Sequence, residues 1–599
     1  MGLMEQAYET YCALESKYVG RYLSELQEPL VPISHQIVNS DIEITLDGEG
    51  NLLNAALTDK SNAAIIIPVT EQSAGRVGET SCAHPLCDQI RFLTPSYPEK
   101  YAAYLTQLHA WENSPFTHPK LHAVARYVEK GSILSDMERF GLITLTDAGL
   151  PVKEKLIVCW RILSQIDREP AECWKDRSLF QSFIQYYASQ QNSETVFCMV
   201  SGKYTVAASQ HPKKIIKTNA NAKLISSNDT SGFTYRGRFF DAQQAATVGY
   251  DVSQKVHSVL HWLAANQGVS LGGRTFLCWN PQGVKLPPVN SPILQKDSTP
   301  RIKYSDYRQA LENAIKGWKE ELSPDSKAVI AAFDASTSGR LSLTYYSELL
   351  ASDFLERLHY WDASCCWQNG PFGICAPSLF RIVNCAFGTV RIVKNQEKLE
   401  TDDRVMRQQI QRLISCRVDK AKMPQDIERA VVTRASNLQI LEPGLRENVL
   451  FTACAVIRKY HYDVKKEEWE MSLVRDKKDI SYQYGRLLAV LEKIERDTYD
   501  RDEGRETNAI RMQSVFAQRP QYASRVIWEQ LKKAYYPRIA PSSRAFYDRL
   551  IGEIIKAISE YPETEQNRPL KDTYLIGYYL QRNELYQSKT EEKTQEEEK

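Results

Sequence analysis

The sequence predicts an α+β protein in which a large mixed N-terminal region is followed by an all-helical C-terminal bundle. Of its 599 residues, 43% are hydrophobic and 25% are charged, which is typical of a globular chain with several sizeable cores. Short apolar runs typical of strands alternate with helical patterns over the first 400 residues. After about residue 400 the strand-like runs become rare, and charged helical patterns take their place.

The first elements are expected to be a helix, a hairpin and a buried strand. Residues 1–25 show helical spacing of apolar positions. Ile42, Ile44 and Leu46 alternate with acids and precede the turn sequence 47–50, which indicates a hairpin. Residues 63–69 read as a short buried strand, and a polar loop follows at 70–76.

Helices and strands continue to alternate up to residue 400. Residues 99–130 predict one or two helices, and residues 241–266 predict another, because their apolar residues recur at near-helical spacing. Further strands are expected at 195–200 (buried), 275–279, 328–333 and 341–346.

The C-terminal part is predicted to be a bundle of short antiparallel helices. An apolar stripe runs from Tyr484 to Ile494, and Arg486, Lys493 and Glu495 are expected to face away from it. Residues 524–535 and 544–559 repeat this pattern. The predicted division is a mixed region at 1–400, a helical connector at 401–470, a bundle at 471–587 and an acidic disordered tail at 588–599.

Composition excludes several classes of protein. The formal net charge of +1 excludes a uniformly basic nucleic-acid coat, although local basic patches remain possible. No apolar stretch is long enough for a membrane span, and the N-terminus lacks the apolar core of a signal peptide. The thirteen scattered cysteines suggest buried, reduced thiols, and we expect a cytoplasmic protein.

Neither a metal nor a cofactor is predicted. Cys82, His84 and Cys87 lie close together, but no CxxC pair accompanies them, so buried thiols and a loop histidine are favoured over zinc. His257 and His261 lie one helical turn apart without an evident third ligand, which favours a polar patch on an exposed helix face. The phosphate-cradle, nucleophile-elbow and zinc-protease motifs are absent from the sequence, which favours binding over catalysis.

Two basic stretches carry the signals for nucleic-acid binding. Between residues 195 and 240, basic residues alternate with aromatics, and Asn, Ser and Thr are frequent. Cations bind phosphate, aromatics stack on bases and amides read base edges, but a solvated loop over an aromatic core explains the composition equally well. Between Arg511 and Arg549, eight basic residues stand against two acids, which suits a single strand along a helical face or simply a solvated surface.

Several segments resemble the large subunit of the type I-C CRISPR surveillance complex, called Cascade, in the same order along nearly the whole chain. The matching segments are 196–204 with His211-Pro212-Lys213, 223–228 followed by 233–237, Arg340–Tyr345, the 65–88 region, the helix from Tyr484 to Lys493 and Leu575–Arg582. Leu580 stands where the family has histidine, so no role is assigned to it.

The resemblance implies a non-catalytic subunit of an RNA-guided complex. Such a subunit lies at the 5′-handle end of the crRNA, beside the crRNA-processing subunit and the backbone subunits. It reads the short protospacer-adjacent motif (PAM) in double-stranded DNA, helps open the duplex, stabilises the displaced strand and recruits a helicase-nuclease. Two alternatives stay open, namely a nucleic-acid-processing enzyme and a structural protein without nucleic-acid contact.

The predicted nucleic-acid contacts follow from these stretches and the resemblance. We expect loop 70–76 and segment 223–228 to form much of the PAM site, with Gln72 and Asn228 bonding base edges, and with Arg76 and Lys223 suited to phosphate or guanine. The full predicted set is Gln72, Ser73, Arg76, Lys213, Lys217, Lys223, Ser226, Asn228, Arg236 and Arg238, with Arg525, Lys532 and Lys533 for the displaced strand.

The resemblance also implies small subunits made by internal translation of the same gene. Met471 lies just before the helix that begins near Tyr484, and codons for Lys466-Glu467-Glu468 are able to form a purine-rich ribosome-binding sequence. A product starting at Met471 would contain the bundle and the tail. Met423 and Met406 are rival starts.

Overall fold

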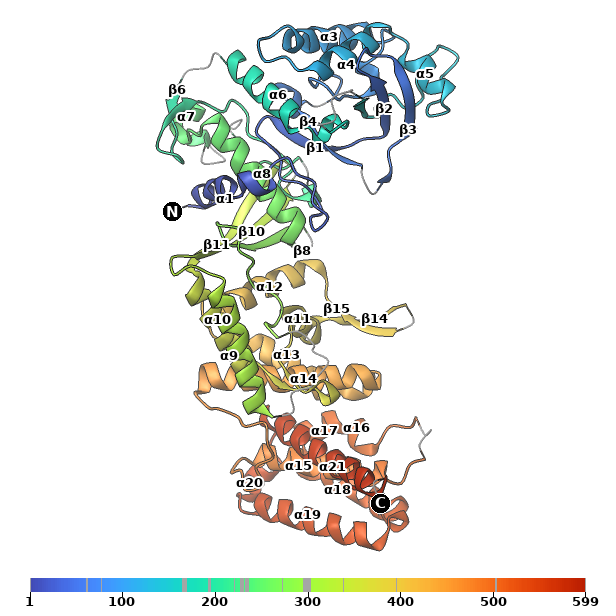
Figure 1. The fold of residues 1–599 in the computed structure, drawn as a ribbon. Helices are drawn as coiled ribbons and strands as arrows, with labels where there is room; N and C mark the ends of the chain where they lie inside the picture. The colour runs from blue at the N-terminus through green and yellow to red at the C-terminus, as the bar shows by residue number, and fades with distance from the viewer. Residues whose placement is uncertain are drawn as a thin grey trace. The chain divides into compact units, whose positions relative to one another are not determined.

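A computed structural model describes the chain apart from residues 1, 61–62, 77, 164–169, 192–194, 220, 227–230, 232–235, 272, 295–302, 338, 395, 501–503 and 598–599. It confirms the α+β class (Figure 1). The chain forms two compact units: unit 1 is Met1–Lys285 with Ser326–Leu349, and unit 2 is Leu286–Asp325 with Leu350–Lys599. The boundary predicted near residue 400 therefore falls inside unit 2. The chain changes unit three times because its last long strand pair returns to unit 1.

The first core of unit 1 is a three-stranded sheet packed with helices. Its strand order is β3-β2-β5, with β2 antiparallel to β3 and parallel to β5. Alternate residues of β2 are buried, as the predicted hairpin requires. Trp111 and Trp160 fill this core. Its elements are β2 (Ile42–Asp47), β3 (Leu52–Leu57), β5 (Val158–Leu163), α3 (Pro98–Glu112), α4 (Pro119–Glu129), α5 (Ile133–Arg139) and α6 (Arg177–Gln190).

A separate antiparallel pair, β1 (His35–Asn39) and β4 (Ala64–Pro68), lies beside this core. Strand β4 confirms the buried strand predicted at 63–69. The short helix α2 (Glu71–Gly75) follows it directly, where the sequence indicated a polar loop.

The second core of unit 1 joins the N-terminal helix to a four-stranded sheet. Its strand order is β11-β10-β9-β8, and α1 packs on α8, which packs on β9. The Trp279 indole N–H donates to Thr10 Oγ1 at 3.0 Å and ties the sheet to α1. The elements are α1 (Leu3–Tyr18), α7 (Ala242–Ala245), α8 (Tyr250–Gln267), β8 (Val269–Leu271), β9 (Arg274–Trp279), β10 (Lys327–Thr337) and β11 (Arg340–Leu350).

The buried strand predicted at 195–200 is wrong. Strand β6 (Thr195–Phe197) is a short strand paired only with β7 (Tyr204–Val206) among the described residues, and Phe197 is 52% exposed. The apolar run at 195–200 suggested a buried strand, but an isolated two-stranded hairpin has no second layer that would cover its apolar side chains.

Unit 2 is mainly helical. Two small hairpins, β12–β13 and β14–β15, occur among its first helices in the sequence, and after β15 the described residues contain helices but no strand. The elements before the bundle are α9 (Tyr304–Glu320), α10 (Ala351–Ser364), β12 (Trp367–Gln368), β13 (Ile374–Cys375), α11 (Leu379–Phe387), β14 (Thr389–Val393), β15 (Gln396–Glu400), α12 (Asp403–Val418), α13 (Gln425–Ala435) and α14 (Pro443–Tyr460).

The C-terminal bundle is built around the close pair α15 and α21. Gly485 and Gly577 allow this contact: a Cβ at Gly485 would lie 1.9 Å from the Tyr574 carbonyl oxygen, and one at Gly577 would lie 2.2 Å from the Tyr482 oxygen. The bundle elements are α15 (Ile480–Arg496), α16 (Asn508–Arg511), α17 (Gln513–Gln518), α18 (Pro520–Ala534), α19 (Pro541–Ser559), α20 (Glu563–Gln566) and α21 (Thr573–Glu597). Helix α21 continues through 588–597, where the sequence indicated a disordered tail.

The prediction that Arg486, Lys493 and Glu495 face solvent is wrong, because all three are at most 3% exposed. Helix α15 packs against α16, α18, α19 and α21, so it has no solvent face in this region. Its charges are instead satisfied internally: Arg486 donates to Gln581 and pairs with Glu553 at 2.9 Å. Buried charges require such partners.

Candidate nucleic-acid interface

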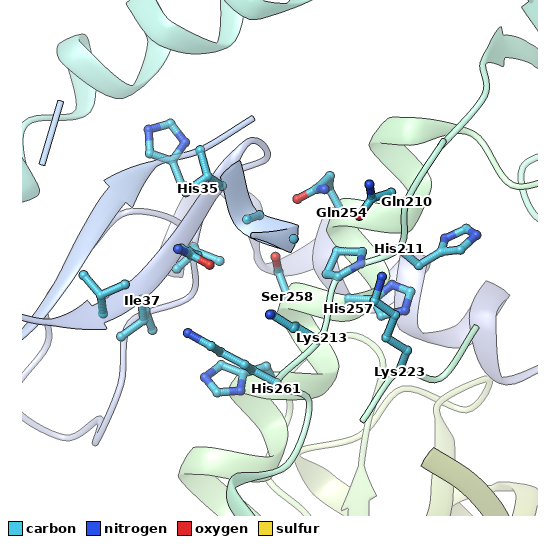
Figure 2. Close-up of a pocket in the computed structure, with 18 of the residues that line it drawn as sticks. His35, Ile37, Gln210, His211, Lys213, Lys223, Gln254, His257, Ser258 and His261 are labelled. Carbon is cyan, nitrogen blue, oxygen red and sulfur yellow. The ribbon is translucent and has the colours of Figure 1, made fainter. Parts of the chain in front are cut away.

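One pocket of unit 1 gathers polar and basic side chains from four parts of the chain (Figure 2). The edge strand β1, the helix α2, the segment 210–223 and one face of α8 line a cavity of about 370 Å³. The polar and charged side chains of its lining are Glu28, His35, Gln36, Asn39, Glu71, Gln210, His211, Lys213, Lys214, Lys217, Lys223, Gln254, His257, Ser258 and His261.

Helix α2 is held in place by its own cap and by the segment opposite. Thr70 Oγ1 accepts from the Ser73 amide at 3.0 Å, and Ser73 is 1% exposed, so Ser73 serves as a capping residue. Glu71 accepts the amides of Ser209 and Gln210 at 3.0 and 3.2 Å. These bonds fix the start of the basic segment against α2.

Backbone pairing positions the rest of the basic segment. Lys213 bridges to Lys223, and Lys223 continues onto the sheet, where its amide donates to Gly339 O and its carbonyl accepts from Leu341. Glu71, Ala74 and Gly75 of loop 70–76 and Lys223 therefore line the same pocket, whereas the predicted contacts Gln72, Ser73 and Arg76 are not part of its lining.

Three lysines of the pocket lack a carboxylate within ion-pair distance among the described residues: Lys213, Lys214 and Lys223. Burial lowers the pKa of Lys213, and the charges of Lys214 and Lys223 lower it further. Burial also lowers the pKa of Lys214. Half-buried cations that repel one another favour an anionic ligand.

Lys217 differs from these three lysines because its ammonium pairs with Glu28 at 2.9 Å. Burial by itself raises the pKa of Glu28, but hydrogen bonds from His261 and Lys217 outweigh it and bring this pKa to about 2. Glu28 is therefore ionised and neutralises the Lys217 end of the pocket.

His257 of the pocket is buried and neutral near pH 7, so it is not part of an exposed polar face. His257 is 2% exposed; burial lowers its pKa to about 4, and its Nδ1 lies 2.7 Å from Ser253 O. His211 stacks on it at 5.9 Å, and burial, followed by the charges of His257 and Lys223, lowers the pKa of His211 to about 3. The expectation of an exposed His257/His261 face was wrong for His257, because α8 lies between α1 and the pocket, whereas His261 is half-buried and lies 2.8 Å from Glu28.

The remaining predicted residues divide into exposed and structural positions. Gln72 is exposed on α2. Arg76 instead pairs with the buried Asp88, its Nη1 lying 2.8 Å from Oδ2, and stacks over Phe92 at 4.6 Å. Its guanidinium is thus occupied inside unit 1.

The predicted segment beyond Lys223 is only partly described. Ser226 is half-buried, and Arg238 is exposed at the end of the short 3₁₀ helix Arg236–Arg238. Asn228 lies outside the described residues.

In unit 2, the α18 face, which we define as Arg525, Lys532 and Lys533, is exposed. The exposed Tyr522 lies one turn before Arg525 on the same helix. The three predicted cations therefore lie on the surface of one helix, together with an aromatic side chain.

Sequence reasoning missed Lys214, Gln254 and Ser258 as pocket residues. Lys214 was counted in the basic stretch, but nothing in the sequence shows that it adopts a left-handed conformation (φ 69°) in the pocket wall. The α8 residues were missed because helical periodicity marks a buried face without showing which cavity it borders.

The described residues contain no group of three or more His, Cys, Asp or Glu side chains able to hold a metal ion. Cys82 and Cys87 are free thiols, and burial raises the pKa of both. None of the described helices has both the length and the apolar composition of a membrane-spanning helix.

Comparison with known proteins identifies the family. No curated protein matches the chain. The model of a family described as CRISPR-associated protein (Cas_Csd1) matches residues 8–586, which is nearly the whole chain. This match supports a large subunit of a CRISPR Cascade complex that works with other Cas subunits. The chain therefore belongs to the Cas_Csd1 family of CRISPR-associated proteins.

Proposed function

We propose that this protein is the non-catalytic large subunit of a type I-C Cascade and recognises the PAM in double-stranded DNA with the pocket of unit 1. The observation that carries the proposal is the meeting of α2 with the basic segment 210–223 around one cavity. Lys213, Lys214 and Lys223 of the lining supply cations for the phosphates. The base-edge reader is Gln72, which is exposed on α2 next to the lining residue Glu71 but does not itself line the cavity. Arg76 is left out of this set because it pairs with Asp88.

The further steps of the proposal concern the opened duplex. The protein helps separate the strands, the α18 face guides the displaced strand, and the assembled complex recruits a helicase-nuclease. Three exposed cations on one helix beside Tyr522 support the strand-guiding role, because single strands bind basic grooves that carry aromatic side chains. The guide RNA reads the target sequence, so this subunit reads only the adjacent motif.

The partners in this proposal are the crRNA, the backbone and crRNA-processing subunits, and small subunits started at Met471. Met471 is 8% exposed, and its carbonyl accepts from Gln368 Nε2 at 3.1 Å. A small subunit starting at this residue would contain α15–α21 without the α14 contact on α21. Replacing the Met471 codon with one that cannot initiate should remove a band of residues 471–599 from the purified complex; persistence of that band would place the start elsewhere.

DNA binding tests the PAM assignment. The full chain is titrated with duplexes randomised at the PAM, at several salt concentrations. Gln72→Ala should change the preferred PAM. Lys213→Ala with Lys223→Ala should weaken all sequences alike and reduce the slope of log K against log salt by about 1.8, because each phosphate contact contributes about 0.9.

The exposed Lys153, which lies outside the pocket, gives the matched control: Lys153→Ala should leave the binding of all duplexes unchanged. Unchanged binding by both the Gln72 variant and the lysine double variant would contradict the proposal. Metal-dependent cleavage of DNA by the isolated chain would favour the enzyme alternative instead.

A further inference from the structure

The hairpin β14–β15 of unit 2 is a two-stranded ribbon that extends away from the helices of that unit (Figure 1). Its register pairs Thr389 with Glu400 at the base and Val393 with Gln396 toward the turn. Among the described residues no further strand pairs with it, so both outer edges lack strand partners. Isolated hairpins are marginally stable, so this ribbon needs support from its base.

The base of the ribbon is firmly anchored. Leu399 is buried, and β15 packs against α11. The Arg434 guanidinium donates to Gly388 O at 2.6 Å, and the Thr401 amide donates to Asn384 Oδ1 at 3.1 Å. Gly388 also requires close approach, because a Cβ there would lie 2.5 Å from Asn384 O. The protein thus holds this ribbon in a defined position.

The outer part of the ribbon carries cations opposite one another. Arg391 and Lys398 are direct cross-strand partners, so their side chains share one face with Cβ atoms about 5 Å apart. Both are exposed, and Lys394 adds a third cation at the turn. Like charges in direct opposition destabilise a strand pair.

The nearby acids neutralise these cations poorly. Glu397 accepts the amide of Glu442 at 3.1 Å, and Glu400 reaches Arg391 only at 3.9 Å with both side chains exposed. An exposed pair at that distance contributes little. The cation pair is therefore available to an external polyanion.

An aliphatic side chain lies on the opposite face. Ile392 is 78% exposed and Val390 is 38% exposed. A β-ribbon fits the major groove of DNA, and branched aliphatic side chains of groove-binding proteins insert against or between bases. The cations of one face suit the phosphates that border a groove, and the aliphatic residue of the other face suits the bases inside it.

We propose that the β14–β15 ribbon is a second duplex-DNA contact, in which Arg391 and Lys398 hold backbone phosphates and Ile392 packs against bases in the groove. The charge of the ribbon selects DNA over a protein strand, because an added protein strand would leave the opposed cations unneutralised. The proposal rests on unit 2 alone and is independent of the pocket of unit 1.

The phosphate contacts and the Ile392 contact can be tested separately. The full chain is bound to a mixed-sequence duplex of about 30 base pairs at several salt concentrations. Arg391→Ala with Lys398→Ala should lower affinity and reduce the slope of log K against log salt by about 1.8, as two lost phosphate contacts require. Ile392→Ser should lower affinity about tenfold and leave the slope unchanged, because a groove contact releases no counterions.

Matched controls are available elsewhere on the chain. Leu57 is 65% exposed at the end of strand β3, so Leu57→Ser controls for loss of an exposed aliphatic residue. Lys153→Ala with Lys285→Ala controls for loss of two exposed cations. Unchanged circular dichroism and melting temperature would show that the ribbon variants remain folded.

Two outcomes would overturn the proposal. If the ribbon variants bound the duplex like the wild type, with an unchanged slope of log K against log salt, the ribbon would not contact DNA. Variants that bind DNA normally but fail to assemble with the other Cascade subunits would assign the ribbon to a protein partner. Since the pocket variants Lys213→Ala and Lys223→Ala leave the ribbon intact, failure of one proposal is distinguishable from failure of the other.

Discussion

Replacing Gly485 with alanine should loosen the C-terminal bundle. The added Cβ would lie 1.9 Å from the Tyr574 carbonyl oxygen and 2.8 Å from the Tyr578 amide nitrogen, whereas ordinary contacts begin at 3.4 Å. Helices α15 and α21 must therefore separate by about 1.5 Å, since both opposing atoms belong to the backbone. Such overpacking costs about 1–3 kcal/mol, and the better helix propensity of alanine offsets up to about 1 kcal/mol. We expect a net loss of about 2 kcal/mol.

Hydrogen exchange of peptides from α15, measured by mass spectrometry on the full chain, is the suitable assay. A protein with two units need not unfold in one step, so a global unfolding curve would be ambiguous. A loss of about 2 kcal/mol corresponds to exchange about thirty times faster.

Gly552 of α19 gives a control of opposite sign, because no atom lies within 4 Å of a Cβ built there. Gly552→Ala should leave α15 exchange unchanged or slow it slightly, through the higher helix propensity of alanine. If Gly485→Ala left α15 exchange as slow as in the wild type, the close packing of α15 on α21 would be wrong.

The remaining predictions concern a buried acid, a buried ion pair and the α18 face. Burial, and then the charge of Asp572, raises the pKa of Glu428 from 4.5 to about 7, so stability falls as pH rises between these values. Glu428→Gln should therefore increase the free energy of unfolding more at pH 8 than at pH 5, by at most about 3 kcal/mol, and melting temperatures at the two pH values measure this difference. Equal gains at both pH values would refute this. Arg76→Ala should destabilise unit 1 by about 3–5 kcal/mol, because Asp88 stays buried without its partner. Hydrogen exchange of β4 and α3 measures this loss. If the variant changed only DNA binding, Arg76 would instead be a DNA-contacting residue. Charge reversal of the three α18 cations should shorten R-loop lifetimes without altering PAM choice. Equal R-loop lifetimes in the wild type and this variant would refute the strand-guiding role.

The order of elements could be predicted from local patterns. The alternation of Ile42, Ile44 and Leu46, the helical spacing after Tyr250 and the apolar run of β4 each depend on residues close in sequence. Two of the mispredicted features, β6 and the charged side of α15, depend on what covers them. A pattern of apolar residues shows that a face can be buried, but it does not show how many faces have partners.

The candidate site shows the same division. The sequence by itself showed the run of basic residues at Lys213–Lys223, and the family resemblance added the expectation that loop 70–76 lies with it. Only the tertiary structure decided that Arg76 turns inward to Asp88, that His257 is buried and neutral, and that Arg391 stands opposite Lys398. The physical reason is that burial and neighbouring charges set the protonation and the availability of a side chain, and these neighbours come from segments far apart in sequence.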